Sequence, residues 1–243
     1  MTFNLTYKAF GERSILIEWP PLIDERILFD IASFKQKIVN NKIKLVVDVN
    51  QAYNSLLVNY ENSILDFDYQ INILIGNYKA KETYKIQNSR LWKIPVCYDE
   101  DFAIDLDNIS VVENISKEEI IKRHFQVNYT VYFIGFLPGF LYLGGLDERL
   151  YFPRKESPRL KVDKGAVAIG GKQTGVYPNE SPGGWNIIGN TPISFFDVSK
   201  NNPCFAKSGD SIQFYPISLK EYHNTKALVE VGVYQIESEV IND

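Results

Sequence analysis

The chain has 243 residues, of which 45% are hydrophobic and 23% are charged, and its formal net charge is −4. This composition is typical of a soluble globular protein with one large domain or two smaller ones. Its acidic balance provides no general attraction for nucleic acids or anionic membranes, so we expect neither as a partner.

The cysteines and histidines further narrow the class of protein to which this chain can belong. Cys97 and Cys204 stand far apart and form no CxxC pair, which indicates a reducing compartment without a disulfide framework. With only His124 and His223 available, a zinc site of the usual His/Cys kind is nearly excluded, and we expect no metal. The first residues lack a signal-peptide pattern, and no apolar run approaches about 18 residues. These features predict a cytoplasmic protein.

The first part of the chain alternates between strand and helix patterns. Its predicted strands are residues 14–19, 45–49 and 55–60. A helix is predicted after Asp24, because apolar residues recur at helical spacing as far as Ile38. A second predicted helix carries an apolar stripe from Ile64 to Tyr78. Together these elements predict a small α+β sandwich whose helices cover one face of a sheet.

Glycine is distributed unevenly, which suggests two architectures joined end to end. Eleven of the fifteen glycines lie between Gly135 and Gly189, whereas residues 1–95 contain two. Residues 79–91 are polar and aperiodic, so we place a linker there. The resulting prediction is a small α/β sandwich domain at residues 1–88 and a second domain at residues 89–243.

The second domain is predicted to be mainly β. It opens with a strand at 91–96 and continues with two short helices, the later one with Ser116 and Glu119 as a capping box. Further strands are predicted at residues 129–134, 166–169, 184–188, 194–198, 211–215 and 227–234. Short strands separated by Gly/Pro turns are typical of a barrel or a sandwich.

Polar and glycine-rich segments between residues 135 and 192 form the candidate site. They contain no P-loop, GxGxxG or GxSxG motif. Glycines allow backbone N–H groups to approach a ligand, and cations could hold a carboxylate or a phosphoryl oxygen. The cations are Arg154, Arg159, Lys161 and Lys172, and the candidate walls are Tyr142, Tyr177 and Trp185. Tight turns with solvated cations would also explain each residue taken singly.

His124 has two interpretations. Its ordinary pKa near neutrality would suit a general base, but a histidine near the end of a helix can equally be a hydrogen-bonded residue of the core. Asp210, which precedes a predicted strand, is interpreted as a turn residue.

Several motifs in this region resemble a known family. They are His124, Tyr129-x-Val131, Gly135-Phe-Leu-Pro-Gly-Phe-Leu-Tyr-Leu143, Pro153-Arg154, Pro158-Arg159, Gln173-Thr-Gly-Val-Tyr-Pro178 and Ser181-Pro-Gly-Gly-Trp185. Upstream, Ile94-Pro-Val-Cys-Tyr98 and Asp105-Leu106 also match. The chain thereby resembles the B components of bacterial ATP-dependent 5-oxoprolinase, also called allophanate hydrolase subunit 1. That family includes the sporulation kinase inhibitor of the KipI type.

The resemblance implies a fold, partners and a reaction. The implied fold is an α+β N-terminal domain followed by a mainly-β cyclophilin-like barrel. The implied partners are the C component, which is a homologous cyclophilin-like protein, the A component, which is of the LamB/YcsF type, and a small-molecule substrate. The implied reaction opens the lactam of 5-oxo-L-proline to L-glutamate while ATP, with magnesium, is hydrolysed.

On this resemblance we expect His124, Arg154 and Arg159 to act in catalysis. The residues expected to bind substrate are Lys161, Lys172, Gln173, Tyr177, Gly183, Gly184, Trp185, Phe136, Pro138, Gly139 and Phe140. Asn190 departs from the family pattern, which commonly has Arg or His there, so a substrate contact at this position is in doubt.

Two other functions compete with the enzyme component. A KipI-like regulator would bind a histidine kinase and block its autophosphorylation. A carboxyltransferase fragment acting on carboxybiotin would need a separate carrier, because this chain has no biotin-carrier motif.

Overall fold

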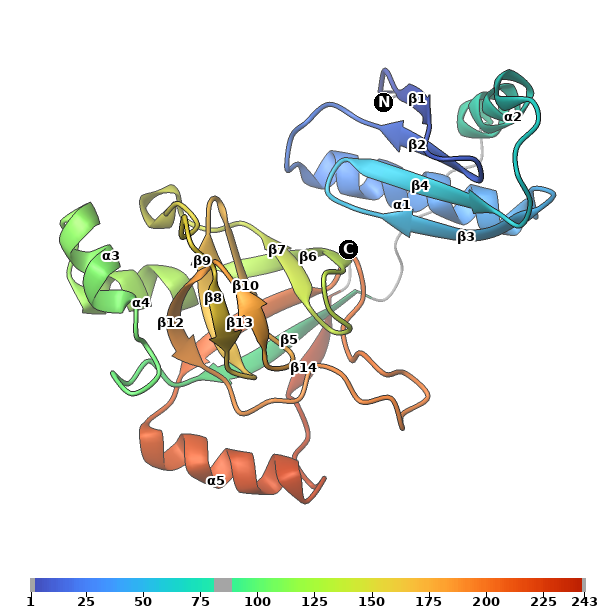
Figure 1. The fold of residues 1–243 in the computed structure, drawn as a ribbon. Helices are drawn as coiled ribbons and strands as arrows, with labels where there is room; N and C mark the ends of the chain where they lie inside the picture. The colour runs from blue at the N-terminus through green and yellow to red at the C-terminus, as the bar shows by residue number, and fades with distance from the viewer. Residues whose placement is uncertain (1–2, 81–88, 242–243) are drawn as a thin grey trace. The chain divides into compact units, whose positions relative to one another are not determined.

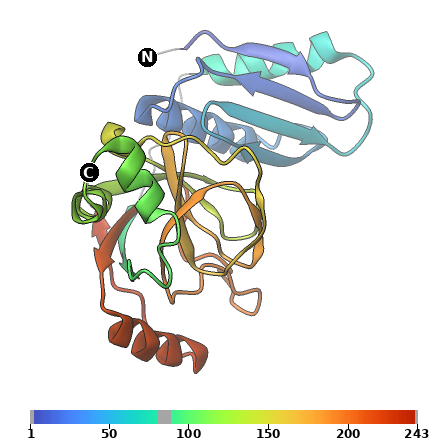
Figure 2. The same ribbon diagram turned by 60° about the vertical axis from the view of Figure 1, so that its left-hand side comes forward.

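The computed structural model describes residues 3–80 and 89–241, and the chain forms two compact units, residues 1–87 and 88–243 (Figures 1 and 2). Most of the predicted linker at 79–91 lies outside the described residues. No helix in the described ranges is both long enough and apolar enough to cross a membrane.

The first unit is a four-stranded antiparallel sheet with two helices. Its strands are β1 (Thr6–Ala9), β2 (Ser14–Glu18), β3 (Val46–Gln51) and β4 (Ser55–Tyr60), in the order β1-β2-β4-β3. Its helices are α1 (Glu25–Asn40) and α2 (Phe67–Lys79). Alternate strand residues, such as Ile15 and Val58, form one core with apolar residues of both helices, which confirms the predicted sandwich. Strand β1 was not predicted.

The second unit is built on an eight-stranded mixed sheet. Its strand order is β12-β9-β10-β7-β6-β13-β5-β14, and only the β13–β5 pairing is parallel among the described residues. These strands are β5 (Ser89–Val96), β6 (Asn128–Ile134), β7 (Leu141–Gly144), β9 (Ala166–Gly170), β10 (Gln173–Val176), β12 (Asn186–Asn190), β13 (Ser211–Pro216) and β14 (Ser238–Ile241). A separate ribbon pairs β8 (Arg159–Val162) with β11 (Ser181–Gly183).

The pairings of the described residues do not close this sheet into a barrel. The edges are β12 and β14, and a single bridge joins Cys97, just after β5, to Asn190 at the end of β12. The sheet therefore curls enough to bring its β12 edge into contact with the end of β5, the neighbour of the other edge strand. The coarser prediction, an α+β protein with a larger β-rich second part, is confirmed.

In the described part of the second unit, four helical segments accompany the larger sheet. They are α3 (Leu106–Glu113), α4 (Lys117–Phe125), the 3₁₀ turn η1 (Glu148–Leu150) and α5 (Leu219–Glu230). In both views α5 lies apart from α3 and α4 (Figures 1 and 2). The Ser116 hydroxyl caps α4 by accepting from the amide of Glu119, but the Glu119 carboxylate pairs with Arg123. The predicted capping box is therefore only half formed.

Two predicted strands of the second unit are wrong. Residues 227–234 belong instead to the end of α5 and the turn that follows it. A complete capping box of Ser218 and Glu221 starts this helix, and Gly232, with φ of +75°, follows its end. Residues 194–198 form no strand either, although Phe195 is buried in the core. Apolar residues of both segments pack against the core, and neither segment pairs with a neighbouring strand.

Asp210 precedes β13, as predicted, and also connects β5 to the loop before β13. It is 1% exposed, and its carboxylate accepts from the amide of Arg90, the indole Nε1 of Trp92 and the amide of Lys207, at 2.9 to 3.0 Å. The carboxylate thus satisfies donors on β5 and on the loop before β13.

We expect Asp210→Ala to lower the free energy of unfolding by about 2–5 kcal/mol, because three partly buried donors lose their buried, charged acceptor. Urea denaturation of both proteins measures the difference. Asp101→Ala, at an exposed position, is the matched control and should change stability by less than about 0.5 kcal/mol. Equal effects of the two substitutions would contradict this role of Asp210.

Candidate functional site

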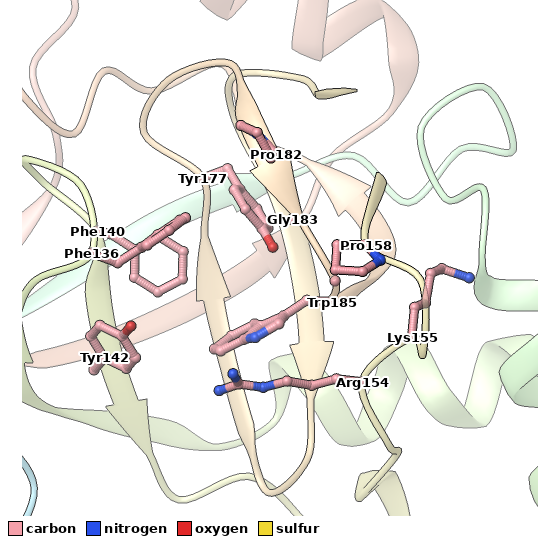
Figure 3. A pocket seen from close by; sticks show the side chains of 11 residues that line it. Phe136, Phe140, Tyr142, Arg154, Lys155, Pro158, Tyr177, Pro182, Gly183 and Trp185 are labelled. Carbon is pink, nitrogen blue, oxygen red and sulfur yellow. The ribbon is translucent and has the colours of Figure 1, made fainter. Parts of the chain in front are cut away.

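A cavity of about 280 Å³ opens on the second unit where the β8–β11 ribbon and β7 approach the segment 153–158 (Figure 3). Its lining combines aromatic side chains, prolines, glycines and two cations. The lining residues are Phe136, Phe140, Tyr142, Arg154, Lys155, Pro158, Tyr177, Pro182, Gly183, Gly184 and Trp185. A concave site of this kind, with few polar groups among aromatic walls, is typical of small-molecule binding.

The aromatic walls form a small core of their own. Phe140 makes edge-on contacts with Tyr177 and Trp185, each with ring centroids 5.5 Å apart. Burial raises the pKa of both Tyr142 and Tyr177, so both hydroxyls stay protonated near neutral pH. The walls are therefore uncharged and rigid.

Glycines near the cavity make room for these rings. A Cβ on Gly170 would lie 2.5 Å from the Trp185 ring, and one on Gly183 would lie 2.3 Å from the Tyr177 hydroxyl. Gly175 would crowd Phe140 and Trp185 at 3.2 Å. The requirement for glycine at these three positions is thus one of packing.

The two adjacent cations of the lining have different surroundings. The guanidinium of Arg154 lies 5.4 Å from the Trp185 ring centroid and donates to Gln173 at 3.4 Å, and it has no carboxylate partner among the described residues. Lys155 instead pairs with the buried carboxylate of Asp105 at 2.8 Å. Arg154 is therefore the cation that the cavity can offer to an anionic ligand.

Asp105 lies behind the wall of the cavity and receives several donors. Arg159 donates to it at 2.6 Å and the amide of Ile187 at 2.7 Å, in addition to the ion pair with Lys155. Burial by itself raises the pKa of this carboxyl, but the three donors outweigh burial and hold the pKa below its usual value. Asp105 is thus charged, and it ties α3 to both β12 and the segment 155–159.

His124 lies in the core, away from the cavity. It is completely buried, its Nδ1 is 2.8 Å from the Tyr98 hydroxyl, and its Nε2 is 2.8 Å from the Thr174 hydroxyl. Thr174 donates its own proton to the carbonyl of Ala168, so Nε2 carries the proton and Nδ1 accepts from Tyr98. Burial lowers the pKa of His124 to about 3. A neutral, fully bonded imidazole in this place holds the core together.

The sequence pattern of the family described as Carboxyltransferase domain, subdomain C and D, matches residues 5–206. The chain belongs to this family. It is 45% identical over 145 residues to the B subunit of 5-oxoprolinase from Bacillus subtilis, which covers 60% of each chain. It is 36% identical over 208 residues to the B subunit of 5-oxoprolinase from Escherichia coli O157:H7, covering 85% of this chain and 93% of that one. The predicted family of 5-oxoprolinase B components is thereby confirmed.

A solved structure extends the comparison at the level of the fold. The urea carboxylase of Kluyveromyces lactis matches 99% of this chain with a TM-score of 0.84 and 21% identity. This chain spans 24% of that enzyme and 60% of the Bacillus subtilis protein.

The structure of this carboxyltransferase-family chain brings together about half of the residues predicted for the site. Those that line the cavity are Phe136, Phe140, Arg154, Tyr177, Gly183, Gly184 and Trp185. Gln173 does not line the cavity itself, but its side chain accepts a hydrogen bond from Arg154, which does. Arg159 does not line the cavity and forms an ion pair with Asp105, an arrangement that suits a residue that positions the wall better than one that contacts a substrate. Gly139, with φ of +85°, packs against Phe195 and Phe196, and neither it nor Pro138 lines the cavity.

Two predicted lysines and Asn190 lie elsewhere. Lys161 is exposed and pairs with Glu180, and Lys172 lies 5.6 Å from the Tyr151 ring centroid. Asn190 is buried, accepts from the Tyr222 hydroxyl and donates to the carbonyl of Lys164. The missing charge at position 190 is therefore explained by a structural contact inside the unit.

Sequence reasoning missed three lining residues, Lys155, Pro158 and Pro182, and it also missed the role of Asp105. A signal for Lys155 was present, since it directly follows Arg154 in the motif region. No local signal joins Asp105 to Lys155, fifty residues later in the chain. In the described ranges, no group of three His, Cys, Asp or Glu side chains could hold a metal ion.

We expect acid to destabilise the protein through His124. Its pKa of about 3 in the folded state lies below the ordinary value of about 6.5, so below pH 6.5 the unfolded chain takes up a proton that the folded chain does not. Stability should be fully present above pH 6.5 and fall toward pH 3, by about 2 kcal/mol between pH 7 and pH 5. Urea denaturation at both pH values measures this loss.

His124→Gln should lack this part of the pH dependence, because glutamine does not titrate. His223→Gln, at an exposed position on α5, is the control and should keep it. A pH dependence that His124→Gln leaves unchanged would show that the imidazole is not held neutral.

We expect Gly170→Ala to destabilise the second unit by about 1–3 kcal/mol, because the new methyl group overlaps the buried Trp185 ring. Thermal unfolding of the variant measures the change. Gly76→Ala on α2, where nothing lies within 4 Å of the added Cβ, is the control and should not destabilise. A neutral Gly170→Ala would contradict the packing requirement.

Proposed function

We propose that this chain is the B component of an ATP-dependent 5-oxoprolinase and that its cavity binds the carboxylate of 5-oxo-L-proline. The observation that carries the proposal is Arg154, a cation without a carboxylate partner in the described part of the chain, held against an aromatic box. A monocarboxylate with a small, uncharged ring matches both features. The homologues named as B subunits of 5-oxoprolinase support this substrate.

The size of the cavity favours a small substrate. About 280 Å³ lies just below the roughly 300–1,000 Å³ of sites for drug-sized ligands, so a single five-membered ring suits it. In this arrangement Arg154 would hold the carboxylate, and Phe140, Tyr177 and Trp185 would pack on the ring and exclude water. The lactam carbonyl would then face the open side of the cavity.

The same cavity does not suit ATP. A triphosphate needs several cations, and in the described lining only Arg154 and Lys155 are cationic, the latter already paired with Asp105. We therefore propose that partner proteins, among them the homologous cyclophilin-like C component and the LamB/YcsF-type A component, supply most of the nucleotide and magnesium contacts. Phosphorylation of the lactam oxygen would make the ring susceptible to water.

The proposal extends to the organisation of the chain. The two compact units would correspond to domains at 1–88 and 89–243, with the curled sheet of the second as a cyclophilin-like barrel. The B component would act in the cytoplasm, where ATP and its partner proteins are available.

We expect the chain, purified with its two partner proteins, to release glutamate and phosphate from 5-oxoproline and ATP. In this assay Arg154→Gln should lower kcat/KM for 5-oxoproline by about 10- to 100-fold, because a charge-assisted contact to the carboxylate is lost. Arg149→Gln, at an exposed position on η1, is the matched control and should remain within about twofold.

Either of two results would contradict the proposal. One is undiminished activity when this chain is omitted from the mixture. The other is equal activity of Arg154→Gln and Arg149→Gln.

A further inference from the structure

Arg154 and Lys155 are neighbours in the chain, yet they extend in opposite directions (Figure 3). The guanidinium of Arg154 reaches under Trp185 toward Tyr142, while the ammonium of Lys155 points away from the cavity. Successive side chains of an extended segment point to opposite sides, which explains the divergence. The Lys155 stem still lines the cavity, and its ammonium pairs with Asp105 at 2.8 Å.

Asp105 is fully committed to this arrangement. Its side chain occupies the position before the first residue of α3, where an aspartate commonly caps the helix, but it makes no hydrogen bond to the amides of that helix. Its carboxylate instead binds Lys155, Arg159 and the amide of Ile187, and the residue is 4% exposed. Replacing these contacts of the buried carboxylate with contacts to water would cost considerable free energy.

The number of available cations decides which anion the cavity accepts. With Lys155 held by Asp105, Arg154 is the one lining cation without a carboxylate partner among the described residues. One cation matches a single carboxylate. Were Lys155 released, its flexible four-carbon stem could bring a second ammonium to the cavity, and two cations would match a dicarboxylate.

We propose that Asp105 is a specificity-determining residue that sequesters Lys155, so that the cavity binds a monocarboxylate in preference to a dicarboxylate. This inference rests on the proposed function and deepens it. 5-Oxo-L-proline has one carboxylate and a neutral lactam, whereas ring opening yields glutamate with two carboxylates. A cavity with one available cation favours the substrate over its product, because the second carboxylate finds no partner there.

Calorimetric titration of the full chain with 5-oxo-L-proline and with glutarate tests the inference, since glutarate carries two carboxylates and no ammonium. We expect Asp105→Asn, which removes the charge and keeps the shape, to tighten glutarate binding about five- to tenfold relative to 5-oxo-L-proline. Adding Lys155→Met to this variant should abolish the gain. Asp107→Asn, which alters an exposed carboxylate of α3 that pairs with Lys117 of α4, should leave the preference unchanged.

A second variant tests the charge argument with Asp105 intact. Pro158→Lys places a new cation at the exposed rim of the cavity and should also favour glutarate. The inference is overturned if folded Asp105→Asn shows no shift toward glutarate, if Pro158→Lys shows none, or if Lys155→Met leaves the gain of Asp105→Asn in place. Loss of stability alone would change both affinities without changing their ratio.

The same titrations separate this inference from the proposed function. No binding of 5-oxo-L-proline by the unmodified chain would count against the proposed substrate. Glutarate bound by Asp105→Asn, and not by the double variant with Lys155→Met, would support the role of Asp105 even then.

Discussion

The interaction on which the site depends is the buried carboxylate of Asp105 with its three donors. Arg159 and Lys155 hold the two ends of the segment 155–159, and the amide of Ile187 fixes β12 beside them. The carboxylate thus joins the start of α3 to β12 and to the segment 155–159, beside a backbone hydrogen bond from the Asp105 amide to the carbonyl of Ile187. A charge removed from water must be paired to be tolerated, and here that requirement positions the wall of a binding cavity.

The aromatic walls impose the other constraint. Rings as large as Trp185 and Tyr177 can lie flat on a sheet only where the facing residues have no side chain, and Gly170, Gly175 and Gly183 satisfy this need. The packed rings give the cavity uncharged walls, against which the exposed guanidinium of Arg154 lies. The glycines of the region and the cation of the cavity are therefore linked, because the glycines allow the packed rings against which the charge of Arg154 lies.

Local patterns in the sequence were sufficient for most elements. Helix α1 begins after Asp24, as the helical spacing of its apolar residues predicts, and the alternation of Ser14–Glu18 specifies a strand with one buried face. The pattern gave wrong strands in two places. Around Phe195 the apolar residues pack in the core without pairing in a strand. At α5 the helix starts at the Ser218 cap, which precedes the apolar residues that were interpreted as a strand. Motif residues located the cavity as well, because Arg154, Tyr177 and Trp185 lie in it together.

The sequence by itself determined the family, the two-part organisation and the aromatic and cationic residue types of the site. The tertiary structure decided which residues serve the cavity and which serve the core. His124 belongs to the motif, yet it is buried in the core and does not line the cavity, while Lys155 and Asp105, fifty residues apart in the chain, form an ion pair. The physical reason is that burial and charge pairing depend on residues far apart in the chain. The sequence shows which groups are present, but only the packing of the folded chain decides which of them are buried or paired and which can contact a ligand.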